Sequence, residues 1–199
     1  MGNQLRKRLT DVATFLGHLH NRSNTRTSVH ETRVLNYMEK ITNELVYWRI
    51  ISGAESERLT RLRRRWAEAQ VLGAASTVTI HGDATPTNFL WDNEHGLAVI
   101  DLERLSIGDR AADLGCLAAE LKHLFWNYGH GATGGEPYIQ HLYASYFDSL
   151  PAGVEDFASL TLRGRFYMGC VLLRISRNIW LDLKYRRQLI EDALECLKI

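Results

Sequence analysis

The chain has 199 residues, of which 45% are hydrophobic and 24% charged, and its formal net charge is +1. This length allows one domain with a sizeable core, and the composition is ordinary for a globular protein. The near-neutral charge does not favour nucleic acid or a membrane surface as a partner. No apolar run approaches the ~20 residues of a membrane-spanning helix.

The first third of the chain predicts three helices. Apolar residues recur at helical spacing over residues 4–21, 29–51 and 55–72. The second range opens on Ser28-Val29-His30-Glu31, which has the pattern of a capping box. Five arginines between residues 58 and 65 are balanced by glutamates and lack an aromatic platform. They predict a solvated helix face rather than a nucleic-acid site.

The stretch 77–113 carries the clearest chemical pattern. A short apolar strand (78–80) precedes a polar loop and two β-rich segments, 88–91 and 97–101. Turn-forming residues with a glycine lie between the two segments, at 92–96, which predicts a hairpin. This part of the chain therefore inserts a small β structure into a mainly helical protein.

Three oxygen-bearing side chains are expected at the ends of these strands: Asp83, Asn88 and Asp101. Phosphoryl transfer needs a group that orients the attacking hydroxyl and accepts its proton, and hard oxygen ligands for Mg²⁺ on the phosphates. A carboxylate on a tight loop suits the first task, so Asp83 is the candidate base. Asn88 and Asp101 are the candidate magnesium ligands. The spacing from Asp83 to Asn88 matches the protein-kinase catalytic loop.

A turn without catalysis is the alternative for this stretch. An Asp followed five positions later by an Asn is common, and such residues more often serve turns. The pattern here is more specific, because a strand, His81-Gly82-Asp83, Asn88, a second strand and a final Asp101 follow in order. The combination favours a kinase-type site.

Four more helices are predicted after the site, over 111–128, 136–150, 157–179 and 183–197. Residues 129–135 contain G-x-G-x-x-G. In a dinucleotide site that motif follows a strand and opens a helix. Here it follows a predicted helix, which favours an interhelix loop over a cofactor site.

The three cysteines, Cys116, Cys170 and Cys196, are odd in number and lie beside apolar helical residues. This usage is typical of reduced thiols rather than of disulfides or a zinc site. The first residues lack the apolar core of a signal peptide. The sequence therefore favours a cytoplasmic protein.

With these residues in view, the sequence resembles the aminoglycoside phosphotransferases and their choline-kinase-like relatives, which are small-molecule kinases with the protein-kinase fold. Their catalytic loop is typically H-G-D-x-x-x-x-N, as at 81–88, and their metal site is an apolar pair followed by Asp, as in Val99-Ile100-Asp101. Residues 108–114 look like the family's G-D-P-x-x-D-L element, with Arg110 where a proline is common. More loosely, 15–20 is similar to a family helix that ends in Leu-His.

The resemblance implies a fold: a single domain over 1–199, mainly α with a small β-hairpin insertion (α+β), like the C-terminal lobe of a kinase. It also implies Mg²⁺ and ATP as cofactors, and an alcohol as the acceptor. His81 is expected to orient or pack the loop. Asp113 is first a helix N-terminal acid, and by resemblance it also braces the catalytic loop. Glu103 is either a secondary metal or water ligand, or simply an exposed or salt-bridged residue.

The parts of a kinase N-terminal lobe are not found in the sequence. None of the five lysines lies on a β pattern like the strand lysine of kinases. The chain is therefore expected to be the C-terminal lobe of a longer enzyme, to receive an N-lobe from a partner, or to be a natural short form.

Three functions follow as hypotheses. The first is a small-molecule kinase acting on an aminoglycoside, choline or sugar-like acceptor, with Glu120 and Glu136 as candidate contacts to a cationic substrate. The second is an inactive kinase-like lobe that binds a metabolite or a protein. A metal-dependent phosphoesterase is weaker, because the sequence lacks the dense His/Asp set of two-metal hydrolases.

Overall fold

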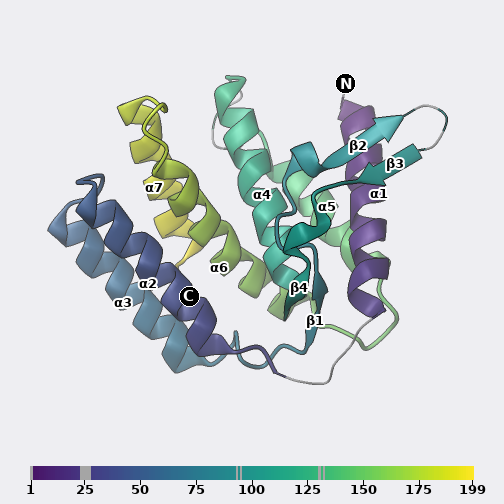
Figure 1. Cartoon of the computed structure of the whole chain (residues 1–199), viewed down its shortest axis with the longest axis horizontal. Helices are drawn as coiled ribbons and strands as arrows, with labels where there is room; N and C mark the ends of the chain where they lie inside the picture. Colours follow the sequence, from purple (N-terminus) through teal and green to yellow (C-terminus); the bar gives the residue numbers. More distant parts are fainter. Residues whose placement is uncertain (1, 23–27, 93, 95, 130, 132) are drawn as a thin grey trace.

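The computed structural model describes residues 2–22, 28–92, 94, 96–129, 131 and 133–199. Most of this part is helical, and a small β region lies beside α1, α4 and α5 (Figure 1), which confirms the predicted α+β class. The helices are α1 (Gly2–Asn21), α2 (Glu31–Tyr47), α3 (Gly53–Ala69), α4 (Arg110–Asn127), α5 (Glu136–Asp148), α6 (Phe157–Ser176) and α7 (Leu183–Cys196).

The β region consists of two antiparallel pairs. The predicted hairpin is confirmed as β2 (Phe89–Asp92) paired with β3 (Gly96–Val99). The predicted strand β1 (Thr77–Ile80) pairs with β4 (Ser106–Asp109), from Thr77 opposite Asp109 to Ile80 opposite Ser106. Strand β4 was not predicted, because Gly and Asp are depleted in strands and its partner is distant in sequence. Short 3-10 helices precede β2 and β4, η1 (Pro86–Asn88) and η2 (Leu102–Arg104).

The predicted capping box at Ser28 is wrong. Ser28 forms an isolated β-bridge with Ser76, and α2 begins only at Glu31. The capping box lies at the next helix instead. There the hydroxyl of Ser52 accepts from the backbone N–H of Glu55, whose carboxylate accepts from the N–H of Ser52 at 2.6 Å.

The predicted helix 29–51 also ends early, at Tyr47. Arg49 adopts a left-handed backbone conformation (φ 54°), and the chain turns there towards α3. The helix predicted over 157–179 ends at Ser176 for a similar reason, since residues 177–182 form a turn before α7.

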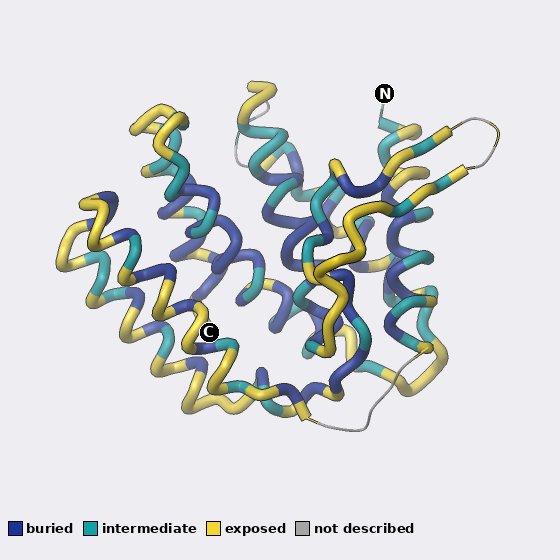
Figure 2. Tube along the Cα trace, in the orientation of Figure 1, coloured by how far each residue is buried: buried dark blue, intermediate teal, exposed yellow. Residues whose placement is uncertain are grey.

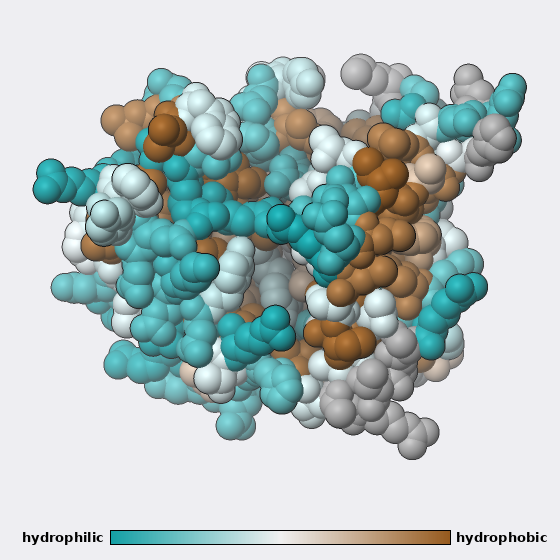
Figure 3. Space-filling model, viewed as in Figure 1, coloured by the Kyte–Doolittle hydropathy of each residue, from teal (hydrophilic) through white to brown (hydrophobic). Residues whose placement is uncertain are grey.

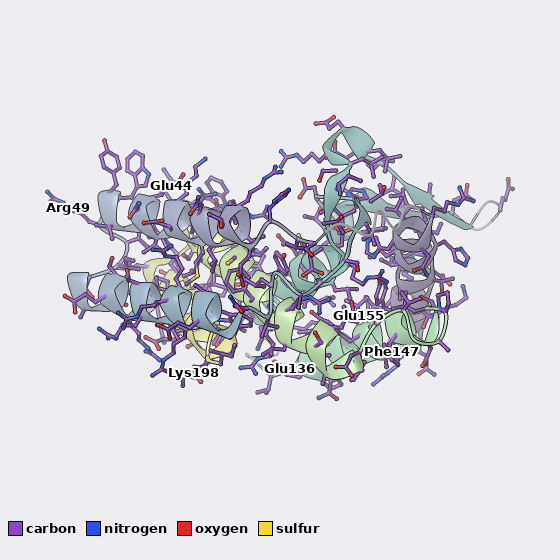
Figure 4. The ribbon with its side chains drawn as sticks, turned by 90° about the horizontal axis from the view of Figure 1, so that it is seen from below. Glu44, Arg49, Glu136, Phe147, Glu155 and Lys198 are labelled. Carbon is purple, nitrogen blue, oxygen red and sulfur yellow. The ribbon has the colours of Figure 1, made fainter. Side chains whose placement is uncertain are left out.

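Helices α4 and α6 form the centre of the molecule and are its most buried elements (Figure 2). They cross closely, because a Cβ atom on Gly115 of α4 would lie 2.8 Å from the carbonyl oxygen of Gly164 on α6. Helix α1 packs against α5 on one side of this pair. The antiparallel pair α2–α3 lies on the other side (Figure 1), and Figure 4 places Glu44 and Arg49 of that pair far from Phe147 of α5.

Buried apolar side chains from all seven helices join one continuous core cluster in the described residues. Trp66 of α3 is fully buried, stacks edge-on against Phe166 of α6 and donates a 2.8 Å hydrogen bond to the carbonyl oxygen of Leu197. The helical pair α2–α3 is therefore packed into the same core as the elements that carry the β region. None of the described helices combines the length and apolar content that crossing a membrane requires.

Candidate active site

The predicted catalytic loop leaves the end of β1 and passes close to η2. At Gly82 the backbone has a positive φ of 80°, and a Cβ atom there would lie 2.3 Å from the carbonyl oxygen of Arg104. Only glycine satisfies both constraints. The His81-Gly82-Asp83 turn is thus set by its own backbone and by the segment that follows Asp101.

Asp113, in the first turn of α4, holds the loop from below. Its carboxylate accepts from the backbone N–H of His81 at 2.7 Å and from that of Gly82 at 3.0 Å. Nε2 of His20 lies 3.0 Å from the same carboxylate and donates to it, and Nδ1 of His20 lies 2.6 Å from the hydroxyl of Tyr146. All these side chains are buried. The carboxylate therefore ties the loop to α1, α4 and α5.

His81 is fully buried beneath the loop. Its Nδ1 accepts from the backbone N–H of Asp83 at 3.3 Å, so the ring proton is on Nε2, which donates to the carbonyl oxygen of Ile100 at 3.1 Å. The ring also packs at 5.8 Å from that of Phe89. His81 therefore joins the loop to the segment that carries Asp101.

Asn88 was predicted to begin a strand, but it is the last residue of the 3-10 helix η1. Its side chain is buried, and its Nδ2 donates to the carbonyl oxygen of Asp83 at 2.8 Å. Its own carbonyl oxygen accepts from the N–H of Ile100 at 3.1 Å. No donor in the described part of the chain reaches Oδ1 of Asn88, which leaves that oxygen for a cation.

Asp101 lies two residues beyond the end of β3, not at its last position as predicted. It is exposed, and its backbone is left-handed (φ 61°, ψ 44°). Two other described non-glycine residues share a positive φ, and both, Arg49 and Gln70, follow the ends of helices, where such a conformation is common. Asp101 has no such role, and strained residues of this kind cluster at functional sites.

The side chain of Asp83 is largely shielded, with 17% exposed, and its carboxylate lies 3.8 Å from Nε of Arg104. Glu103 is exposed, and within the described residues it forms no ion pair. Glu103 is therefore exposed rather than salt-bridged, which agrees with one part of the alternative, and its role as a metal or water ligand stays a prediction.

The donor set suits Mg²⁺. Asn88 and Asp101 supply hard amide and carboxylate oxygens, and Mg²⁺ on a nucleotide takes its remaining ligands from phosphate and water. Among the described residues, no three His, Cys, Asp or Glu side chains gather as a protein-only metal cage. That pattern fits a metal shared with a nucleotide and does not match the dense ligand set of a two-metal hydrolase.

A buried ion-pair network behind the site was not predicted. Arg163 donates to Asp109 at 2.9 Å and to Glu155 at 2.7 Å, and Glu155 also lies 3.6 Å from Arg110. Asp109 in turn caps α4 through the N–H of Ala111. Figure 4 places Glu155 beside the start of α6, at the edge of the β region. The only sequence signal was Arg110 in the place of a proline.

A cleft of about 600 Å³ opens beside the loop. Its walls come from α2, from the β1–β4 pair, and from α4 and α6, and Gly82 and Arg104 line it at the loop. Figure 3 shows this hollow near the middle of the face, between a hydrophilic half and a half where apolar side chains gather. The cleft is the natural place for a small molecule next to Asp83.

The two carboxylates proposed for a cationic acceptor do not line this cleft. Glu136 pairs with Lys122 at 2.6 Å and borders a separate cavity between α5, α6 and α7. Glu120 lies 3.7 Å from Arg174. Burial raises the pKa of Glu120, an effect that Arg174 opposes and Asp83 reinforces.

Comparisons with known proteins bear on the family and the fold of the chain. The sequence profile of the phosphotransferase enzyme family matches residues 2–156. A Plasmodium vivax ethanolamine kinase has a TM-score of 0.59 at 16% identity, over 94% of this chain and 59% of its own. The choline kinase LicA from Streptococcus pneumoniae has a TM-score of 0.51 at 16% identity, over 98% of this chain and 64% of its own.

A glucosamine kinase in complex with glucosamine, ADP and inorganic phosphate has a TM-score of 0.56 at 16% identity, over 98% of this chain and 50% of its own. At such identities these structures share the fold. The chain spans about half to two thirds of the length of these kinases. No curated protein matches the sequence.

Proposed function

Because the chain belongs to the phosphotransferase enzyme family, we propose that it supplies the catalytic half of a small-molecule kinase. In this proposal the γ-phosphoryl group of ATP passes to a hydroxyl of a small molecule bound in the cleft. An N-terminal lobe, from a longer chain or from a partner, covers the nucleotide. The three free, buried cysteines agree with a cytoplasmic location.

One observation carries the proposal: hydrogen bonds connect the three candidate residues into one unit. His81 bonds to the backbone of both Asp83 and Ile100, which precedes Asp101. Asn88 bonds to the same two segments, through its side chain to Asp83 and through its backbone to Ile100. Such fixed positioning is most of what phosphoryl transfer requires from a protein.

Each residue then has a defined task. The carboxylate of Asp83 accepts a hydrogen bond from the acceptor hydroxyl, aims its oxygen, and takes the proton as the new O–P bond forms. Oδ1 of Asn88 and the carboxylate of Asp101 would hold Mg²⁺, which when bound neutralises charge on the phosphates. Nε of Arg104 lies 3.8 Å from the carboxylate of Asp83 and would help to orient it.

The first test is calorimetric titration of MgATP into the 199-residue chain and into its Asp101→Ala variant. We expect binding that needs Mg²⁺ and that weakens at least about tenfold in the variant, because one of two protein ligands is lost. An exposed carboxylate away from the site, Asp148→Asn, is the matched control. Equal Mg²⁺-dependent binding by Asp101→Ala would contradict the metal assignment.

The second test measures phosphoryl transfer in a form that includes the N-terminal lobe. Asp83→Asn should lower kcat by about 10²–10⁴-fold, the usual contribution of a general base, with little change in nucleotide affinity. Full activity in Asp83→Asn would refute its role as base. Nucleotide binding without any transfer to alcohols in the intact protein would favour the alternative, an inactive lobe that binds a metabolite or protein.

A further inference from the structure

The charges that line the 600 Å³ cleft bear on the acceptor. Two carboxylates reach its wall, and both already have partners within the protein. Asp109 is paired with the buried guanidinium of Arg163 at 2.9 Å. Asp113 accepts from two backbone N–H groups and from His20. Neither offers a free negative charge to a cationic ligand.

Three guanidinium groups line the same cleft from three different elements: Arg33 of α2, Arg104 of η2 and Arg174 of α6. Arg33 is exposed, and no carboxylate in the described part of the chain pairs with it. The side chain of Arg174 is 26% exposed, and its nearest carboxylate, Glu120, is 3.7 Å away, beyond hydrogen-bond distance. Arg104 is paired with Asp83 at 3.8 Å, whereas Arg33 is unpaired among the described residues and Arg174 forms only one long contact with Glu120, so Arg33 and Arg174 keep donors for a ligand.

Arg174 also has a fixed position. Its Nη2 lies 3.9 Å from the sulfur of Cys116, on the neighbouring helix α4. Tyr37, one turn after Arg33 on α2, lines the cleft with Arg174 and adds a hydroxyl. The cleft is thus lined by the partly buried guanidinium group of Arg174, by a second arginine, Arg33, and by the phenol of Tyr37. Arginine is suited to carboxylate and phosphate because its parallel N–H groups bind two oxygens at once.

We propose that the cleft holds its acceptor by an anionic group, so that the substrate is a hydroxylated acid, with a carboxylate or phosphate on Arg174 and Arg33 and its hydroxyl towards Asp83. The placement of the substrate hydroxyl towards Asp83 rests on the proposed function. The binding of an anionic group rests only on the residues that line the cleft. It separates this chain from the ethanolamine, choline and glucosamine kinases of similar fold, whose named substrates carry an amine or ammonium.

The test uses four sugars that share the glucose ring and differ in one substituent: glucuronate and glucose 6-phosphate are anions, glucose is neutral and glucosamine is a cation. Each is titrated into the 199-residue chain by calorimetry or ligand-observed NMR, without nucleotide. We expect at least one of the two anions to bind about tenfold or more tightly than glucose and glucosamine, and its binding to weaken with salt. Preference between the two anions identifies carboxylate or phosphate as the recognised group.

Variants locate the site. Arg174→Gln and Arg33→Gln should each weaken binding of the preferred anion about tenfold, with glucose unaffected. Arg65→Gln, an exposed arginine of α3 outside the cleft, is the control. Arg174→Lys keeps the positive charge and should retain part of the affinity for the anion. Such partial retention would show that the loss in Arg174→Gln is not caused by misfolding. Tyrosine and tryptophan circular dichroism confirms that each variant is folded.

Two outcomes would overturn the inference. In the first outcome, neither anion binds more tightly than glucose; a result in which none of the four sugars binds belongs to this outcome. The other is anion binding that both arginine variants leave unchanged. Because no nucleotide is present, failure of phosphoryl transfer would leave these results standing, and failure here would leave the roles of Asp83 and Asp101 intact.

Discussion

The carboxylate of Asp113 accepts from three donors on two separate parts of the chain. An amide in its place has one acceptor oxygen, and its NH₂ group would face an N–H donor. The arrangement therefore depends on charge as well as shape, because a carboxylate alone accepts at both oxygens. This is the residue on which the position of the catalytic loop depends most.

We accordingly expect Asp113→Asn to lower the free energy of unfolding by about 2 kcal/mol or more, since at least one buried N–H loses its acceptor. Urea unfolding followed by circular dichroism measures the change. Asp148→Asn, at an exposed position that forms no ion pair in the described residues, should stay within about 0.5 kcal/mol. Equal stability of the two variants would show that the loop does not need this anchor.

At the scale of elements, α4 and α6 approach each other closely at Gly115. A Cβ atom on Gly115 would lie 2.6 Å from Cβ of Tyr167 and 2.8 Å from two backbone atoms of α6. Backbone cannot move aside as a long side chain can, so the two helices would have to separate. Separation would displace Arg163 from Asp109 and the start of α4 from the loop.

Gly115→Ala should therefore destabilise the protein by about 1–3 kcal/mol or more, the cost of overpacking a core. Gly53→Ala is the matched control, because Gly53 is also helical but nothing lies within 4 Å of its added Cβ. Gly53→Ala should leave the stability unchanged or raise it by up to about 1 kcal/mol. Thermal unfolding of the two variants measures the difference in stability. If Gly115→Ala is as stable as Gly53→Ala, the close crossing of α4 and α6 is contradicted.

The elements differ in how far the sequence could predict them. Helices with a strong apolar stripe, such as α1 and α3, and the β2–β3 hairpin follow from local patterns. Strand β4 does not, because Ser106-Ile107-Gly108-Asp109 becomes a strand only by pairing with β1. The site residues were predicted from spacing, but the anchoring of the loop by His20 was not, because that contact joins positions 93 residues apart.

At the scale of the whole molecule, exposed apolar residues gather on one face. Leu90 of β2 and Ile107 of β4 are 48% and 51% exposed, and Ile100, Leu102 and Leu105 lie between them in sequence and are also exposed. Figure 3 shows apolar side chains concentrated on the half of the surface formed by the β region. Concentrated apolar surface of this kind marks an interaction face. It borders Asp101, where the proposed nucleotide and N-lobe would lie.

Leu105→Ser with Ile107→Ser should reduce binding of a hydrophobic dye to the native chain while changing stability by only about 0.5 kcal/mol, because both side chains are exposed. Ile179→Ser with Leu183→Ser, at the exposed α6–α7 turn, is the control and should reduce dye binding less. Dye fluorescence at equal protein concentration measures the difference. Equal losses would mean that the apolar residues act singly rather than as one face.

The packing of α1 on α5 has a consequence for how the protein is made. Thr10 and His141, which lie 2.9 Å apart across this interface, are separated by 131 residues of sequence. On a ribosome that adds about 5–20 residues per second, α1 emerges on the order of ten seconds before α5 exists. Until then its apolar residues Leu9, Val12 and Leu16 are exposed and can bind chaperones, and His20 lacks its hydrogen-bond partner Tyr146. The catalytic loop therefore lacks part of its hydrogen-bond network until α5 has been translated. A chain that stalls before that point would be released without a complete site.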